Sequence, residues 1–180
     1  MNNRLDQKRI AIVATDGFEQ SELFEPRKAL LEAGAVVEVV APKGGSIQGV
    51  VHGKKGKMIA VDCEIDAANA DDYAALVLPG GVANPDSLRM DGRVVDFVRH
   101  FVEAHKPIAA ICHGPWTLIE AKGVRGRKTT SWPSLKTDLE NAGAQWVDQE
   151  VVVEDKLITS RKPEDLPAFC RVIVDEFEAA

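Results

Sequence analysis

The sequence predicts an α/β protein in which helices cover both faces of a mostly parallel sheet. Four short apolar runs are typical of buried strands: residues 9–14, 36–40, 74–78 and 107–111. Segments with apolar residues at helical spacing alternate with these runs. The runs are apolar throughout, which favours a sheet that is covered on both faces.

The first half of the chain begins with a strand at 9–14 (RIAIVA), and the turn signal Thr15-Asp16-Gly17 ends it. A helix follows and is expected to stop at Gly34. Pro26 lies either in the first turn of this helix or at a kink. After the strand at 36–40, glycines and lysines surround short apolar pieces at 42–61, which predicts an extended or hairpin excursion.

The second half repeats the alternation of strand and helix. Asp91 is a suitable N-cap for a helix whose inner face carries Val94, Phe97, Val98 and Phe101. Later helices are predicted at 113–122, 133–142 and 164–177, and a strand is predicted at 146–153.

Composition limits the classes of function. The 180 residues suit one domain, which we expect to span residues 1–180. A formal net charge of -6 and a pI near 5.3 argue against a nucleic-acid-binding surface. No apolar run approaches the roughly 20 residues that cross a bilayer. The polar first nine residues lack the apolar segment of a signal peptide. We therefore expect a cytoplasmic protein without a membrane partner.

The cysteines predict neither a disulfide framework nor a zinc site. There are three of them, Cys63, Cys112 and Cys170, and none forms a CxxC pair. The run PKGGS lacks the spacing of a phosphate-binding P-loop. We expect no metal and no cofactor.

Three predicted strand ends are candidates for one site, because ligands of parallel sheets bind beyond the carboxyl ends of the strands. These ends are residues 16–19, 79–81 and 112–113. Cys112 lies between a strand and a helix, where helix N–H groups favour the nucleophilic thiolate. The alternative is that Cys112 is simply a small core residue.

The neighbours of Cys112 also allow two interpretations each. His113 either caps or packs against the helix, or supplies a backbone N–H group to an oxyanion. Gly80 and Gly81 form either a tight turn or a close approach of the backbone to a ligand. Glu19 is a helix-end carboxylate unless the fold brings it to Cys112. A raised pKa would then let it act as a general acid or base.

Five stretches of the sequence resemble the DJ-1/PfpI superfamily, and its PfpI subfamily in particular. The similarity extends over about residues 9–177. The stretches are DGFEQSE (16–22), ALVLPGG (75–81), AAICHGP (109–115), GRKTTSWPSLKTDLENAGAQWVD (126–148) and SRKPEDLPAF (160–169).

The resemblance implies a flavodoxin-like three-layer sandwich with Cys112 as nucleophile at a strand-to-helix elbow. It implies that Glu19 is the buried proton partner and that the N–H groups of Gly81 and His113 form an oxyanion site. In PfpI-like proteins the histidine pairs with an acid from a neighbouring subunit. The matching position here is Asp86, so a homodimer or hexamer is expected.

The superfamily includes several activities, and the fold does not choose among them. A thiolate beside a protonated carboxyl group suits attack on a small aldehyde such as methylglyoxal. We therefore expect a cofactor-free glyoxalase or deglycase that acts on methylglyoxal or glycated protein in stress protection. The alternatives are an intracellular cysteine peptidase, which would act on unfolded protein, and a redox sensor in which Cys112 is oxidised.

Overall fold

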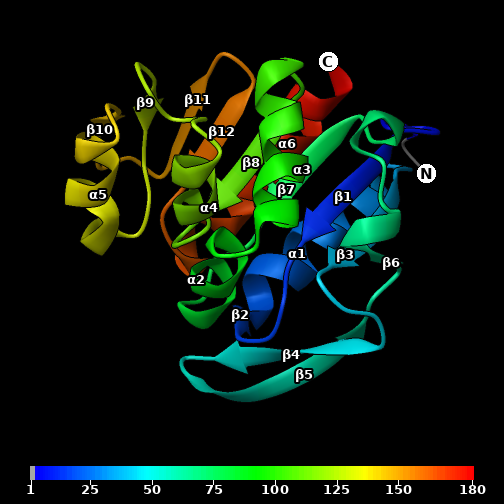
Figure 1. Cartoon of the computed structure of the whole chain (residues 1–180). Coiled ribbons are helices and arrows are strands. Elements are labelled where there is room, and N and C mark those ends of the chain that lie inside the picture. The colour runs from blue at the N-terminus through cyan, green and yellow to red at the C-terminus, as the bar shows by residue number, and fades with distance from the viewer. Residues whose placement is uncertain (1–2) are drawn as a thin grey trace.

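A seven-stranded sheet forms the centre of the computed structural model, which describes residues 3–180 (Figure 1). All its neighbouring strands run parallel, except that β11 is antiparallel to β12. The predicted mostly parallel sheet is thus confirmed. In spatial order the strands are β11 (Val151–Glu154), β12 (Leu157–Ser160), β8 (Ile108–Ile111), β7 (Ala75–Leu78), β1 (Arg9–Val13), β3 (Val36–Ala41) and β6 (Cys63–Glu64).

Helices cover both faces of this sheet, so the predicted three-layer sandwich is confirmed. One face is covered by α1 (Gln20–Glu32) and α6 (Leu166–Glu178), and the other by α2 (Ala83–Arg89), α3 (Gly92–Glu103) and α4 (Pro115–Glu120). The remaining elements lie outside these layers. They are α5 (Lys136–Asn141), the strand pair β9 (Lys128–Thr129) and β10 (Gln145–Trp146), and the short 3-10 helices Ile65–Ala67, Ala70–Asp72, Pro133–Leu135 and Pro163–Asp165.

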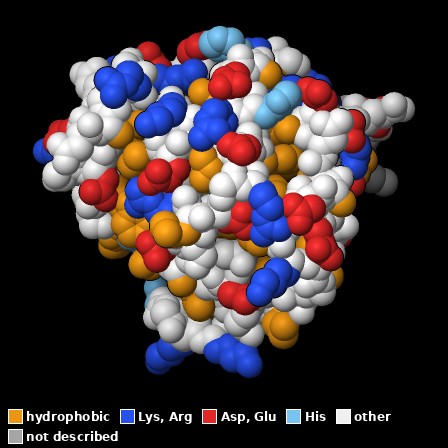
Figure 2. Space-filling view, viewed as in Figure 1, with side chains coloured by type: hydrophobic (Ala, Val, Ile, Leu, Met, Phe, Trp, Pro, Cys, Tyr) orange, Lys and Arg blue, Asp and Glu red, His pale blue; other side chains and the backbone are white. Residues whose placement is uncertain are grey.

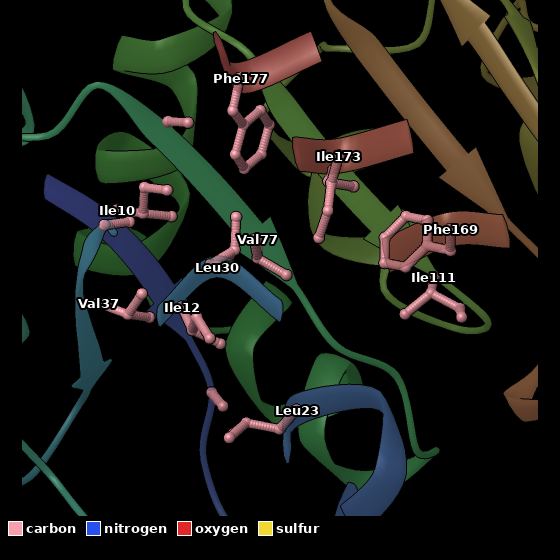
Figure 3. Close-up of a cluster of buried hydrophobic side chains, with 14 of the residues drawn as sticks. Ile10, Ile12, Leu23, Leu30, Val37, Val77, Ile111, Phe169, Ile173 and Phe177 are labelled. Carbon is pink, nitrogen blue, oxygen red and sulfur yellow. The ribbon is translucent and has the colours of Figure 1, made fainter. Parts of the chain in front are cut away.

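Alternating side chains of the central strands divide the core into two clusters. Ile10 and Ile12 of β1 face α1 and α6, whereas Ala11 and Val13 face the opposite helices. Figure 3 shows the first cluster, in which Phe169, Ile173 and Phe177 of α6 approach side chains of the sheet. Burial of each such aromatic or aliphatic side chain contributes about 1.5–3 kcal/mol.

The ends of the helices follow the sequence signals. Asp91 accepts a hydrogen bond from the N–H of Arg93 and caps α3, as predicted. Gly34 follows α1 with φ of +96°, a conformation that glycine adopts without steric cost. Pro26 lies inside α1 rather than in its first turn. Pro115 is the first residue of α4, so this helix begins two residues after the predicted start at His113.

The excursion at 42–61 is a hairpin, one of the two forms that the sequence predicted. Its strands β4 (Ser46–Val51) and β5 (Lys54–Ala60) are antiparallel, and β2 (Phe18–Glu19) pairs with β4 in parallel. These strands form a separate small sheet beside the central one (Figure 1). The tip of the hairpin therefore lies near the segment that leads from β1 into α1.

Two parts of the second half differ from the prediction. The single strand expected at 146–153 is wrong, because Trp146 belongs to β10 and Val151 begins β11. Neither β12, whose four residues are all buried, nor α2 was predicted from the sequence. Both are short, and polar residues interrupt the apolar pattern that would have marked them. Residues 3–180 contain no helix that is long and apolar enough to span a membrane.

Candidate active site

Cys112 lies in the turn between β8 and α4, as predicted for a nucleophile elbow. Its φ is +62°, a left-handed conformation that costs energy in residues other than glycine. Two backbone hydrogen bonds hold it there: its N–H donates to the oxygen of Ser160, and its own oxygen accepts the N–H of Trp132, at 3.1 and 3.0 Å. Only 7 % of Cys112 is exposed. The thiol is therefore held at the edge of the core by backbone geometry.

Gly80 lets three elements meet at Cys112. A Cβ atom at this position would lie 2.5 Å from Oε2 of Glu22 and 2.7 Å from Cβ of Cys112. Both separations are too short for any side chain. The close packing at Gly80 joins the end of β7 to α1 and to the Cys112 turn.

The carboxyl group beside Cys112 belongs to Glu22, and the expectation that Glu19 occupies this place is wrong. Glu22 is completely buried. Its Oε2 accepts the N–H of Gly80 at 2.8 Å, and the carboxyl group is within hydrogen-bonding reach of the thiol. Its Oε1 is buried without a hydrogen-bond partner among the described residues. A proton on Oε1 would remove the cost of burying an unpaired charge.

Burial raises the pKa of Glu22 to about 8, although the N–H of Gly80 opposes the rise. The carboxyl group is therefore mostly protonated at neutral pH. The sequence contained a signal for this position: Glu22, Pro26 and Leu30 recur at four-residue spacing and are all buried on the inner face of α1. The position of Glu19 just past the predicted strand end favours that residue in the sequence, although it does not lie on this inner face.

Glu19 instead lies at the mouth of the site. It is the N-cap residue of α1, but its side chain makes no capping hydrogen bond. Its Oε2 accepts the backbone N–H of His52, at the tip of the hairpin, at a distance of 3.3 Å. Glu19 is partly exposed, whereas Glu22 is fully buried.

His113 contacts the thiol within the same chain, which the sequence did not predict. Its Nδ1 lies 3.1 Å from Sγ of Cys112. The ring stacks on Trp132 at an interplanar angle of 22° and meets Trp116 edge-on. Burial lowers the pKa of His113 below its ordinary value, which favours the neutral imidazole. A neutral ring can accept the proton of a thiol.

The electrostatics of Cys112 are balanced between opposing effects. Burial and the negative charge of ionised Glu22 raise the pKa of the thiol, so the lowering expected from the helix end is not the net result. The N–H groups of His113 and Gly81 act in the opposite direction and lower it. Protonation of Glu22 removes the repulsion. The same two N–H groups are those expected to hold an oxyanion.

Asp86 does not join the site within one chain. It is exposed on α2, and across residues 3–180 its side chain makes no hydrogen bond or ion pair. Its neighbour Asn84 has the structural role in this segment. The fully buried Asn84 amide donates to the oxygens of Pro79 and Gly80 and accepts the N–H of Thr15. The Asp86 side chain is thereby left on the surface.

A cavity of about 500 Å³ opens above Cys112. Its volume lies in the range that suits small organic ligands. Of its lining residues, we call the buried Cys112, Glu22 and His113 the floor. The exposed or partly exposed ones form the rim, which includes Glu19, Val50, His52, Gly53, Trp132, Pro163 and Glu164. In the described part of the chain, no group of three or more His, Cys, Asp or Glu side chains is arranged to hold a metal ion.

Comparisons with known proteins agree on one family. The model of the DJ-1/PfpI family matches residues 8–176. The chain is 49% identical over 166 residues to General stress protein 18 of Bacillus subtilis and 47% identical over 166 residues to Protein/nucleic acid deglycase 2 of Escherichia coli; each match covers 91% of this chain and 94% of the relative. It is also 44% identical over 164 residues to "Putative cysteine protease YraA" of Bacillus subtilis, a match that covers 91% of this chain and 95% of that protein.

The solved structures show the same fold. The crystal structure of Drosophila melanogaster DJ-1beta superimposes with a TM-score of 0.86 at 28% identity. The match covers 97% of this chain and 92% of the fly protein. The chain therefore has the fold of this solved structure. The mostly parallel sheet between two layers of helices, which the sequence predicted, is part of that fold.

Proposed function

Since the chain belongs to the DJ-1/PfpI family, we propose that it is a cofactor-free cysteine enzyme that acts on methylglyoxal or on its adducts with proteins. One observation carries the proposal: the Cys112 thiol lies at the floor of a cavity, beside both the protonated carboxyl group of Glu22 and the neutral ring of His113. The relatives named as a deglycase and a general stress protein support this choice.

In the proposed first step, Cys112 attacks the aldehyde carbon of the substrate. The thiol proton passes to Nδ1 of His113, a carbon–sulfur bond forms, and the carbonyl electron pair moves to oxygen. The N–H groups of Gly81 and His113 stabilise this oxygen, which takes the proton from the His113 ring to give a hemithioacetal. Each group is already within reach of the sulfur.

Glu22 would then move a proton between adjacent carbons. As carboxylate, it removes the proton from the carbon that bears sulfur and returns it to the neighbouring carbonyl carbon. The hydroxyl proton of the hemithioacetal moves to the oxygen of that neighbouring carbonyl group. The product is a thioester of lactate, which water hydrolyses to lactate and the free thiol. A pKa of about 8 lets Glu22 exist in both protonation states near neutral pH.

Replacement of the nucleophile tests the proposal. We expect Cys112→Ser to lower the rates of methylglyoxal consumption and lactate formation at least about 100-fold, because the hydroxyl is a far weaker nucleophile at neutral pH. Cys170→Ser is the matched control, since Cys170 is a free, partly buried cysteine that does not line the cavity. Lactate formation that survives Cys112→Ser would contradict the assignment.

A cysteine peptidase is the second candidate. The 3.1 Å contact between Cys112 and His113 resembles a nucleophile–base pair, and one relative is named as a cysteine protease. Cleavage of an unfolded protein should be measured on the same wild-type and Cys112→Ser samples. Cysteine-dependent cleavage without lactate formation would favour this candidate over the first.

We also propose that the site lies at an interface between subunits, where Asp86 of one copy approaches His113 of another. Exposed apolar side chains support this: Val82 and Trp132 line the cavity and are 58 % and 39 % exposed, and Met90 at the end of α2 is 83 % exposed. Figure 2 shows hydrophobic side chains gathered on the side of the molecule that carries α2 and α4. Sedimentation at several concentrations would test it, and a fully active monomer would contradict it.

A further inference from the structure

The segment from Asp16 to Gln20 connects the hairpin to the site through three side chains. Oδ1 of Asp16 accepts the N–H of Gln48 at 2.7 Å. Oε2 of Glu19 accepts the N–H of His52 at 3.3 Å, and Oε1 of Gln20 accepts the N–H of Lys57 at 2.7 Å. All three hydrogen bonds run from hairpin backbone to side chains of one short segment. We call these three side chains the hairpin clamp.

Two glycines of the hairpin allow the segment that carries the clamp to approach the hairpin backbone closely. A Cβ atom at Gly56 would lie 2.7 Å from Oε1 of Gln20, and one at Gly49 would lie 3.0 Å from the ring of Phe18. Glycine at both positions therefore lets the segment approach the hairpin backbone. At the tip, His52 and Gly53 have φ of 49° and 77°, as a tight hairpin turn requires.

The two ends of the hairpin are held differently. Near its base, Ile47 is only 5% exposed and belongs to the core cluster of α1 and α6. At the tip, neither His52 nor Gly53 is buried. Backbone pairing with the segment that carries the clamp reaches Val50, and within residues 3–180 the Glu19 carboxylate makes the one side-chain hydrogen bond to the tip beyond it. Its loss would free the tip and leave the base in place.

The tip forms part of the wall around Cys112. Val50, His52 and Gly53 line the cavity together with Trp132 and Glu164. Since only 7 % of Cys112 is exposed at the floor, the spacing of these walls controls what reaches the sulfur. Figure 1 shows the hairpin lying across the end of the molecule that also holds β2 and the start of α1.

We propose that Glu19 is a positioning residue that, with Asp16 and Gln20, holds the hairpin tip as a wall and so restricts the size of the group that can reach Cys112. The consequence for substrates rests on the proposed function: the clamped wall would favour small free dicarbonyl compounds over carbonyl groups carried on large proteins. Glu19 then acts through the hairpin and has no part in proton transfer.

The test compares two reagents of the same chemistry and different size. Iodoacetamide and 5-iodoacetamidofluorescein both alkylate thiols, and mass spectrometry of the peptide that contains Cys112 gives each rate. In the wild type we expect the small reagent to react at least about tenfold faster, because access limits the large one. Glu19→Ala should reduce this ratio at least about fivefold by speeding the large reagent alone.

A conservative variant separates positioning from proton chemistry. Glu19→Gln keeps an oxygen that accepts the His52 N–H. It should therefore keep both the wild-type ratio of alkylation rates and the wild-type rate of hydrogen exchange at the His52 amide. Glu19→Ala should speed that exchange. Gln20→Ala offers the same test from a second point of the clamp should Glu19→Ala fold poorly. Glu25→Ala, at an exposed position of α1 outside the cavity, is the control.

Two results would overturn the proposal. One is an unchanged ratio of rates in folded Glu19→Ala or, if that variant does not fold, in Gln20→Ala. The other is an equal change in Glu19→Gln and Glu19→Ala, which would show that the charge of Glu19 matters rather than its hydrogen bond. Alkylation requires no turnover, so a wild type that fails to consume methylglyoxal would refute the proposed function and leave this test intact.

Discussion

The floor and the rim of the Cys112 cavity are built in different ways. At the floor, Glu22 is completely buried and Cys112 is fixed by backbone hydrogen bonds from two other segments. At the rim, Glu19 is partly exposed and holds the hairpin tip through one hydrogen bond of 3.3 Å. Two carboxyl groups that are three residues apart in the sequence thus lie in contrasting environments.

This contrast explains why only one of the two carboxyl groups suits proton transfer. Burial raises the pKa of Glu22 to about 8 because water no longer stabilises the charged form. The floor gains chemical reactivity from burial and tight packing. The side chains of the rim are exposed or partly exposed, so they can be substituted without disturbing the packing around the thiol. Changes at the floor should therefore affect folding and chemistry together, whereas changes at the rim should affect access.

Gly80→Ala should have the largest effect, because it places a methyl group between Glu22 and Cys112, directly against the floor of the cavity. The new Cβ would lie 2.5 Å from Glu22 and 2.7 Å from Cys112. We expect about 3 kcal/mol of lost stability from overpacking, measured by urea unfolding, together with slower alkylation of Cys112. A variant with wild-type stability and wild-type alkylation would show that the floor is looser than described.

The contrast also marks how far the sequence alone could lead. Apolar runs and helix caps predicted the sheet and the Cys112 turn, because strand ends in a parallel sheet converge on one edge. The choice between Glu19 and Glu22 depended on where α1 begins. A shift of a few residues rotates a helix and exchanges its inner and outer faces. The pattern of buried residues on α1 could have resolved the choice, whereas the His113–Cys112 contact could not be predicted without the backbone angles of the turn.

Glu22→Gln should have the next largest effect. The amide oxygen can still accept the N–H of Gly80, but the side chain can no longer give or take a proton. We expect methylglyoxal turnover to fall about 100-fold, within the range typical of a lost general acid or base. The far-UV circular dichroism spectrum should not change. Wild-type turnover in this variant would exclude Glu22 as the group that moves the proton between the two carbons and would favour His113 for that role.

The same variant tests the raised pKa through stability. The ordinary pKa of the group is 4.5, and in the folded protein it is about 8. Between these values the folded state holds more protons than the unfolded state, so stability falls as pH rises. One such group contributes a slope of at most about 1.4 kcal/mol per pH unit. Glu22→Gln lacks this slope, so its stability relative to the wild type should rise from pH 5 to pH 8. Urea unfolding at both pH values checks this, and parallel curves would contradict it.

Gly53→Ala should have the smallest effect, and it applies the same chemical change at the rim. No atom lies within 4 Å of a Cβ placed at this position, so no clash arises. The cost comes from the φ of +77° alone, which we expect to be about 1 kcal/mol. Because the strain falls on the hairpin tip, alkylation of Cys112 by iodoacetamide should match the wild type. If Gly53→Ala slowed this reaction as much as Gly80→Ala does, the rim and the floor would form one coupled unit, and the distinction between access and chemistry would fail.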